Sequence, residues 1–391
     1  MIKLSRLIFF VGILSMVISC KEAYDPPAIA DAPVYLVVEG FINLNGSTNI
    51  RLSRSTQLKD TSKIAPETRA VLMIEDEQNG KFRLTELKGG NYMLPASGLN
   101  AGRKYRLRIK TASSSEYLSD FVEALQTPEI DSVNFKIQNN GVKFYVSTHD
   151  AQNKTKYYRW DYDETWLYTS LHTSLIEYEK GILQFRPLDK PVFKCWKSNS
   201  SKIIILGSSS NLVSDQIVDN PISFVTAESG KVSFGYSILV RQTALNKEAY
   251  EYWQTLKKNT EQLGSIFDPQ PSIASGNIKC ISKPQELVIG YLSASSVSSR
   301  RQYFDNRNFP MHSPSYIAPP SLSACEISDI MISPAATFPS RVVQVFSSGQ
   351  YIPVSPISQP GAGIIGYTYS LKGCADCRVK GGTTEKPAFW P

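Results

Sequence analysis

The amino-acid sequence predicts a mainly β protein that contains one amphipathic helix. Residues 49–54 and 104–110 alternate apolar and polar side chains, as strands with one wet face do. Turn-forming residues such as Asn45-Gly46 and Gly89-Gly90 separate these stretches at short intervals. Such spacing predicts an N-terminal β-sandwich of immunoglobulin or fibronectin type, and a larger β-rich domain should follow it.

The first predicted domain covers residues 34–127. It starts with a run rich in β-branched residues and ends before Pro128, where proline interrupts regular structure. Its expected strands are residues 35–40, 49–54, 70–75, 81–87 and 104–110.

The second predicted domain covers residues 128–391. Apolar runs and alternating patterns predict strands at residues 141–148, 156–168, 203–206, 231–242 and 286–293. A helix is expected near 246–263, with Asn246 as its cap and Trp253 on the apolar stripe as a core anchor. The segment Phe267–Ser272 and the Cys-containing C-terminal tail from Cys374 to Pro391 are irregular in sequence.

The amino terminus carries an export signal. Residues 1–19 combine a basic start with an apolar core too short to span a membrane, and they end in Val-Ile-Ser before Cys20. This is the pattern of a bacterial lipobox, in which the chain is cut between Ser19 and Cys20 and Cys20 is lipidated. Residues 20–33 then form a proline-containing tether. An ordinary secretory signal with a chance cysteine is the alternative.

The cysteine content predicts disulfide bonds in an oxidising compartment. Five cysteines remain after Cys20, an odd number, so at least one thiol stays unpaired. The five are Cys195, Cys280, Cys325, Cys374 and Cys377, and the sequence leaves open which of them pair. A redox role for the last two lacks a thioredoxin-like setting, and a zinc site lacks further ligands.

Charge and motifs exclude several classes of function. The net charge is +7, but its basic residues are scattered, which argues against a nucleic-acid partner. The chain contains no Gly-x-Ser-x-Gly elbow, no His-Glu-x-x-His pair and no cofactor motif, so we expect no catalytic residues, no metal and no cofactor. The candidates for ligand binding are Trp160, Asp161, Asp163 and Trp166, although the aromatic residues of a strand more often belong to the core. Strand alternation places the two aspartates on one face, as a ligand site or as an ordinary solvated surface.

Several stretches of the chain are distinctive when taken together. They are the lipobox, residues 36–40, 157–160, 164–166, 195–196, 236–240 and 249–253, the more specific run 258–272, and the tail 374–391. These stretches resemble an outer-membrane lipoprotein family of Bacteroidota known only as domain of unknown function 4249. Members of that family are commonly encoded beside TonB-dependent receptors. The resemblance therefore implies a surface lipoprotein that works with such a receptor, and it implies no catalytic residue. Cys280 lies where the family is not expected to have a cysteine, so the resemblance makes it the candidate for the unpaired thiol. The disulfide candidates are then Cys195, Cys325, Cys374 and Cys377.

Three hypotheses follow for the function. The first is a binding or accessory subunit of a TonB-dependent nutrient importer, anchored in the outer membrane by its lipid and exposed at the cell surface. The second is a structural or adhesive surface protein, and the third is a surface hydrolase that uses Asp161 and Asp163. The missing catalytic motifs favour the first two. Because proline-rich irregular stretches seldom build a core, we expect a partner to meet Phe267–Ser272 or the tail from Cys374 to Pro391.

Overall fold

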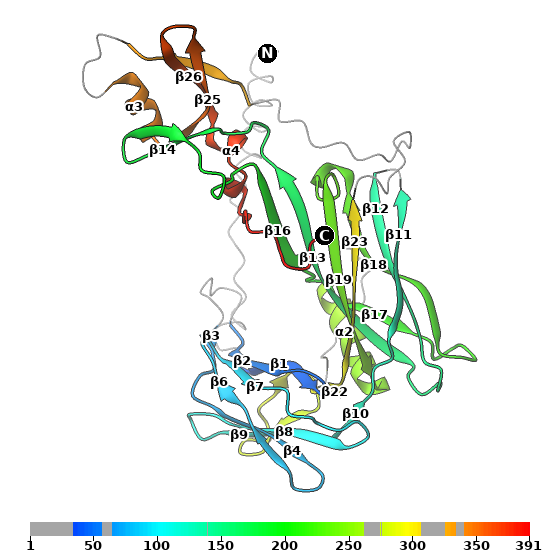
Figure 1. The fold of residues 1–391 in the computed structure, drawn as a ribbon. Helices are drawn as coiled ribbons and strands as arrows, with labels where there is room; N and C mark the ends of the chain where they lie inside the picture. Colours follow the sequence, from blue (N-terminus) through cyan, green and yellow to red (C-terminus); the bar gives the residue numbers. More distant parts are fainter. Residues whose placement is uncertain are drawn as a thin grey trace, which may run out of the picture.

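The computed structural model describes residues 34–56, 65–138, 140–261, 274, 276–305, 325–333 and 340–391. Strands dominate these residues, which confirms the prediction of a mainly β fold. Figure 1 shows an N-terminal β-domain, a central β-domain and a small C-terminal lobe that projects from the end of the central domain. Residues 1–33, with Ser19 and Cys20, and the segment Phe267–Ser272 lie outside the described residues.

The N-terminal domain is built from two groups of antiparallel strands with a common core between them. The first group is β1 (Leu36–Asn43), β2 (Thr48–Arg54), β3 (Ala65–Pro66), β6 (Thr85–Glu86) and β7 (Asn91–Leu94). The second is β4 (Val71–Asp76), β5 (Lys81–Arg83), β8 (Lys104–Lys110), β9 (Glu116–Ser119) and β10 (Val122–Leu125). Ile50 and Leu107, from different groups, are both buried in this core, as the alternation predicts.

Three strands from much later in the chain complete this domain. β20 (Ile278–Cys280) pairs with β9, and β21 (Val288–Ile289) pairs with β1. β22 (Ala294–Ser295) lies between β1 and β10 and joins the two groups. The prediction that residues 128–391 form one domain therefore needs correction, because 278–295 belong to the N-terminal sheet. Strands of two or three residues carry too little pattern to reveal this from sequence.

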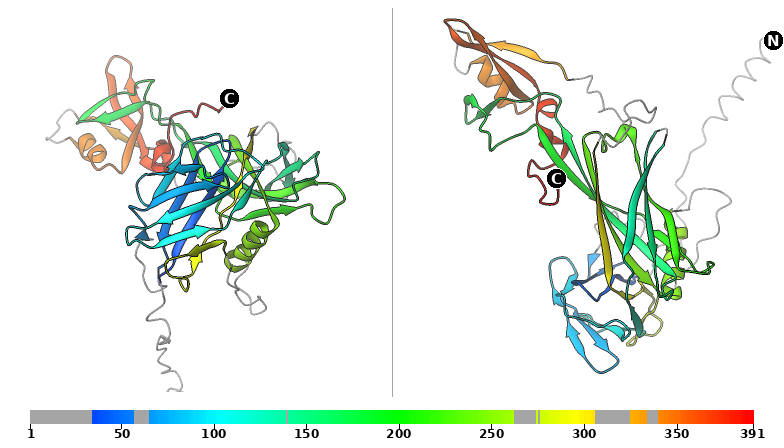
Figure 2. Two further views of the ribbon diagram at one scale, coloured as in Figure 1. Left: turned by 90° about the horizontal axis from the view of Figure 1, so that it is seen from below. Right: turned by 45° about the vertical axis from the view of Figure 1, so that its right-hand side comes forward.

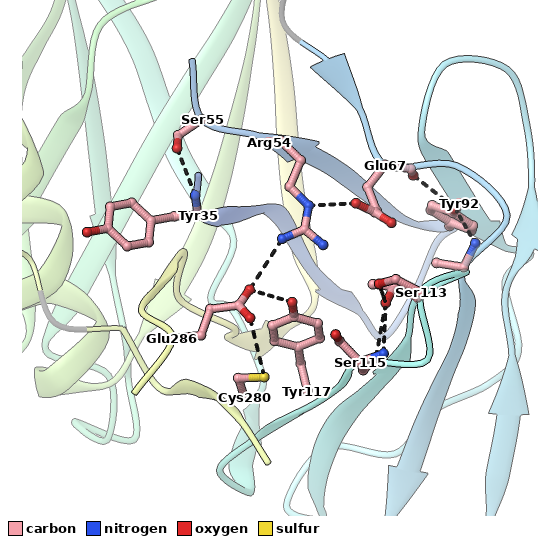
Figure 3. A network of polar contacts seen from close by, with 12 residues as sticks. Tyr35, Arg54, Ser55, Glu67, Tyr92, Ser113, Ser115, Tyr117, Cys280 and Glu286 are labelled. Carbon is pink, nitrogen blue, oxygen red and sulfur yellow. Dashed lines mark hydrogen bonds and ion pairs between the residues drawn. The ribbon is translucent and has the colours of Figure 1, made fainter. Parts of the chain in front are cut away.

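A polar cluster fastens the late segment to the early strands. Arg54 on β2 donates to Glu67 over 2.6 Å and to Glu286 over 3.3 Å, and the Tyr117 hydroxyl donates to Glu286 over 2.5 Å (Figure 3). Burial and the nearby Glu286 carboxylate raise the pKa of Tyr117 to about 12, so the hydroxyl keeps its proton and remains a donor. The unpaired, buried Cys280 completes the cluster.

The central domain packs two sheets face to face. One contains β11 (Ile130–Gln138), β12 (Gly141–His149) and β18 (Gln216–Thr226), which a 3₁₀ turn (Ala227–Ser229) follows. The other contains β13 (Tyr157–Thr169), β16 (Lys194–Ser200), β17 (Ile205–Ser208), β19 (Gly235–Leu245) and β23 (Val297–Asp305). Phe144 from the first sheet stacks on Tyr236 from the second, with ring centroids 5.1 Å apart.

The predicted amphipathic helix is present as α2 (Lys247–Glu261), and Asn246 caps it by accepting from the Ala249 amide over 2.9 Å. The core-anchor prediction for Trp253 is wrong, because its side chain is only half-buried. Tyr252 is the buried aromatic residue of the helix. No helix among the described residues is long and apolar enough to cross a membrane.

The C-terminal lobe adds elements that the sequence patterns did not predict. Its sheet contains β24 (Ser328–Met331), β26 (Gly363–Leu371) and β25 (Tyr351–Gln359), and the hairpin β14 (Ile176–Glu179) and β15 (Ile182–Phe185) lies nearby. The helices are α3 (Arg341–Ser347), α4 (Lys372–Ala375) and the 3₁₀ helix η5 (Cys377–Lys380). β25 contains Pro353 and Pro356, which argue against a strand in sequence but fit here because β25 is an edge strand.

One disulfide joins the tail to the end of the central sheet, and a second joins two parts of the lobe. Cys195 pairs with Cys377 and Cys325 pairs with Cys374, whereas Cys280 is free. The prediction of two disulfides among these four cysteines is therefore confirmed, and a direct bond between Cys374 and Cys377 does not form.

The last residues of the chain lie along the central sheet. Thr383 forms an isolated bridge with Trp196, and Trp390 is buried against Tyr303, with ring centroids 5.2 Å apart. The expectation that the tail from Cys374 to Pro391 presents a docking face is weakened, because Trp390 has an internal packing role.

Candidate functional site

The four predicted ligand-binding residues do not form one site, because strand β13 points them in opposite directions. Trp160 and Trp166 face the interior between the two central sheets. Asp161 and Asp163 occupy alternate positions on the outer face. The two tryptophans and the two aspartates therefore cannot bind one ligand together.

Trp160 is a core residue. Its side chain is 1% exposed, stacks on Tyr158 and donates its indole N–H to Gln242 over 2.7 Å. Trp166 lies nearer the surface, half-buried, with the Lys231 ammonium 4.7 Å from its ring centroid. It lines an apolar cavity of about 460 Å³ together with Tyr168 and Phe193.

Arg241 on β19 holds both aspartates. Its guanidinium donates to Asp161 over 2.6 Å and to Asp163 over 2.5 Å. The hydrogen bond from Arg241 lowers the pKa of Asp163, so this carboxyl is ionised at neutral pH. The geometry differs from an acid–base pair, which needs one carboxyl group to keep a proton.

A cavity of about 720 Å³ opens between the N-terminal and central domains, beside this arginine–aspartate cluster. We call it the interdomain cavity; its volume lies within the usual range of small-molecule sites. Its lining residues come from four places: the β1–β2 region, the outer face of β13 and β19, helix α2, and residues 289–297. They are Val37, Val38, Glu39, Gly40, Phe41, Asn43, Ser47, Asn49, Arg159, Asp161, Arg241, Thr243, Tyr252, Trp253, Leu256, Ile289, Gly290, Tyr291 and Val297. Figures 1 and 2 show α2 at the end of the central domain that adjoins the N-terminal domain.

Local sequence explains how the walls come together. Arg159 has the outward register of β13, two residues before Asp161, and helix α2 contacts this strand. Gly290 lets the late segment approach β1 closely, because its φ is +143° and a Cβ there would lie 2.3 Å from the Val38 carbonyl oxygen.

Arg159 and Trp253 form a cation–π contact in the wall of the interdomain cavity. The Arg159 guanidinium carbon lies 3.8 Å from the Trp253 ring centroid, and the Trp253 ring meets Tyr252 edge-on. Burial lowers the pKa of Arg159, while the nearby Asp161 charge opposes the shift. Among the described residues, no ion pair or hydrogen bond of the Arg159 guanidinium is found.

The sequence patterns identified Asp161 but missed Arg159, Arg241 and Trp253 as its neighbours. The outward register of Arg159 was available from strand alternation. Its meeting with Trp253 depends on where α2 crosses the sheet, which no local pattern specifies. No cluster of three or more His, Cys, Asp or Glu side chains suited to a metal ion is found in the described part of the chain.

His149 and Asp150 do not form a dyad. The Asp150 carboxylate accepts from the backbone of Lys154 over 2.9 Å and of Thr155 over 2.8 Å, and so closes a turn. The His149 Nδ1 lies 2.8 Å from Asp131 instead. Asp150 therefore serves the turn that follows strand β12.

We expect an NMR titration to place the pKa of His149 above its ordinary value of 6.5, because it gains a hydrogen bond and charge attraction from Asp131. A raised folded-state pKa stabilises the protein below pH 6.5, and this contribution is lost as the pH rises through the raised value. Asp131→Asn should lower the His149 pKa, whereas Asp150→Asn should change it less. Equal effects of the two variants would contradict the assignment.

Comparison with known proteins identifies one family by sequence. The sequence model of the family described as "Domain of unknown function (DUF4249)" matches residues 21–301. No curated protein matches the chain. One solved structure is described as "Complete structure of manganese lipoxygenase of Gaeumannomyces graminis and partial structure of zonadhesin of Komagataella pastoris". It shares 8% identity over 55% of this chain and 89% of its own, with a TM-score of 0.12, which carries no argument.

Proposed function

The chain belongs to the family described as Domain of unknown function (DUF4249), and we propose that it is an outer-membrane lipoprotein exposed at the cell surface. In this proposal it serves as a binding or accessory subunit of a TonB-dependent nutrient importer. The receptor performs the transport, and this chain supplies a ligand-binding module.

The proposed location is supported by the amino-terminal signal and the disulfides. Several acyl chains on Cys20, at ~0.8 kcal/mol per buried CH₂, hold a protein on a membrane durably. The tether of residues 21–33 reaches at most about 3.3–3.6 Å per residue, so the β-domains would work close to the bilayer. The bonds of Cys195 with Cys377 and of Cys325 with Cys374 suit an oxidising compartment.

The observation that carries the binding role is the interdomain cavity. It combines aromatic walls with Arg159, Asp161 and Arg241, a few polar groups in an otherwise largely apolar site. This composition, and a location between domains, are typical of ligand-binding sites.

A crosslinking experiment on intact cells tests the proposal. After solubilisation of the outer membrane in detergent, the captured protein should bring a β-barrel receptor with it. Cys20→Ser is the matched control: it should leave the membrane fraction, lose palmitate label and capture no receptor.

Three outcomes would contradict the proposal. Palmitate labelling that survives Cys20→Ser would show that Cys20 is not the lipidated residue. Resistance of the protein to protease added to intact cells would show that it does not face the cell exterior. If no receptor is crosslinked, the structural or adhesive hypothesis replaces the importer hypothesis.

A further inference from the structure

We propose that the interdomain cavity binds a ligand with a carboxylate group and an apolar, aromatic-sized body, and that the Arg159 guanidinium receives the carboxylate. The inference rests on the proposed function only in treating this cavity as a binding site. It needs neither the lipid anchor nor the receptor.

The first argument is the state of Arg159. Its guanidinium stacks over Trp253 at 3.8 Å and has no ion-pair partner within the described residues. A guanidinium stacked on a ring keeps its N–H groups in its own plane, pointing away from the stack. The planar fork is therefore left to pair with a two-oxygen acceptor, and carboxylates fit it in bidentate geometry.

The second argument is the contrast with Arg241, which lines the same cavity. Arg241 already donates to Asp161 and Asp163 at 2.5–2.6 Å, so both of its anionic partners are internal. Arg159 is the lining arginine whose charge no described carboxylate contacts directly. Burial of a charge without a partner is costly, and a bound anion would offset that cost.

The third argument selects a carboxylate over a phosphate. Asp161 and Glu39 also line the cavity, and both are acidic. Their charges repel a dianionic phosphate more strongly than a monoanionic carboxylate. Because Arg159 supplies one positive charge without an ion-pair partner among the described residues, a ligand with a single negative charge matches it better than a dianion.

The fourth argument concerns the rest of the ligand. Trp253, Tyr252 and Leu256 from α2 and Tyr291 from the late segment line the cavity together, with Tyr252 and Tyr291 ring centroids 5.3 Å apart. Aromatic surfaces of this kind bind flat apolar groups by stacking and by burial. The ligand class is therefore an aromatic or similarly apolar carboxylic acid.

Binding of three matched probes tests the inference: 4-phenylbutyrate, 4-phenylbutanamide and 3-phenylpropyl phosphate. Dissociation constants are measured by ligand-observed NMR on the full exported chain carrying Cys20→Ser. We expect the acid to bind about tenfold or more tightly than the amide, as one charge-assisted hydrogen-bonded pair provides. The phosphate should bind more weakly than the acid.

Variants then assign the effect to one residue. Arg159→Gln should remove the preference for acid over amide, and Arg159→Lys should keep part of it because the charge remains but the fork is lost. Arg301→Gln is the matched control: Arg301 stacks on Phe389 at 3.6 Å but does not line the cavity, so the preference should persist.

Several results would overturn the inference. They are equal binding of acid and amide to the parent chain, no saturable binding of any probe, and an unchanged preference in Arg159→Gln. A phosphate that binds as tightly as the acid would overturn the carboxylate assignment. If Arg159→Gln does not fold, the acid–amide comparison on the parent chain and on Arg159→Lys still decides. Failure to capture a receptor would contradict the importer proposal but would not change these binding measurements. The two proposals can therefore be tested independently.

Discussion

Replacing Cys195 and Cys377 together by serine should lower the free energy of unfolding by about 2–5 kcal/mol. The bond joins β16 to η5 across a sequence separation of 182 residues, and both cysteines are fully buried. In the chain-entropy model, a crosslink restricts the unfolded chain more as the closed loop lengthens. The measurement is the denaturant midpoint followed by circular dichroism, without reductant.

The tail should also become accessible in that variant. The remaining contacts of the tail are noncovalent: the Thr383 bridge with Trp196, hydrogen bonds at Cys377 and Lys380, and the packing of Phe389 and Trp390. Limited proteolysis should therefore cut near residues 377–391 before other sites. Cys280→Ser is the control, because that thiol forms no disulfide. An unchanged midpoint in the Cys195/Cys377 double variant would show that the bond contributes nothing measurable.

Trp160→Ala should cost about 3–5 kcal/mol of stability, as full truncation of a buried aromatic side chain does. The Trp160 ring lies directly over Gly207 on β17, where an added Cβ would come within 2.5 Å of it. The truncation also leaves the buried Gln242 side-chain oxygen without the indole donor, which adds a penalty. Chemical denaturation, with near-ultraviolet circular dichroism as the readout, measures the loss.

Two matched variants separate packing from hydrogen bonding. Trp160→Phe keeps much of the ring but removes the N–H, so we expect an intermediate loss. Trp253→Ala removes a half-buried tryptophan at the interdomain cavity, so we expect a clearly smaller loss than at Trp160. A larger loss from Trp253→Ala would restore Trp253 as the core anchor.

Strand alternation predicted most of the regular fold. The pattern at residues 104–110 became β8 with alternating burial, and residues 156–168 became β13 with a shift of one residue at each end. The helix was found because α2 has both a cap at Asn246 and an apolar stripe. These features are local, so the sequence contains them directly.

Long-range pairings could not be predicted in the same way. β21 and β22 have two residues each, and their place beside β1 depends on the complete N-terminal core. The C-terminal sheet was missed because Pro353 and Pro356 mask its edge strand. Disulfide pairing also depends on three-dimensional position, so the spacing left it open, and only the family resemblance set Cys280 apart from the other four cysteines.

In the candidate site, too, local patterns predicted which residues share a face, but not which distant residues they meet. Asp161 and Asp163 share a face, as alternation predicts, whereas Trp160 has the opposite register and belongs to the core. Residues 160 and 161 are neighbours in sequence, but the strand places their side chains on opposite faces. Arg159 gained its importance only when α2 brought Trp253 over it.

The late strands have a consequence for the order in which the chain can fold during synthesis. A growing polypeptide presents residues 34–127 long before β20, β21 and β22 emerge. Until then, β1 and β9 lack partners that they have in the finished sheet, and unpaired strand edges promote association between chains. Because β20, β21 and β22 follow most of the central domain in sequence, that domain must be synthesised before the N-terminal sheet is complete. Residues 34–127 alone are therefore an incomplete folding unit.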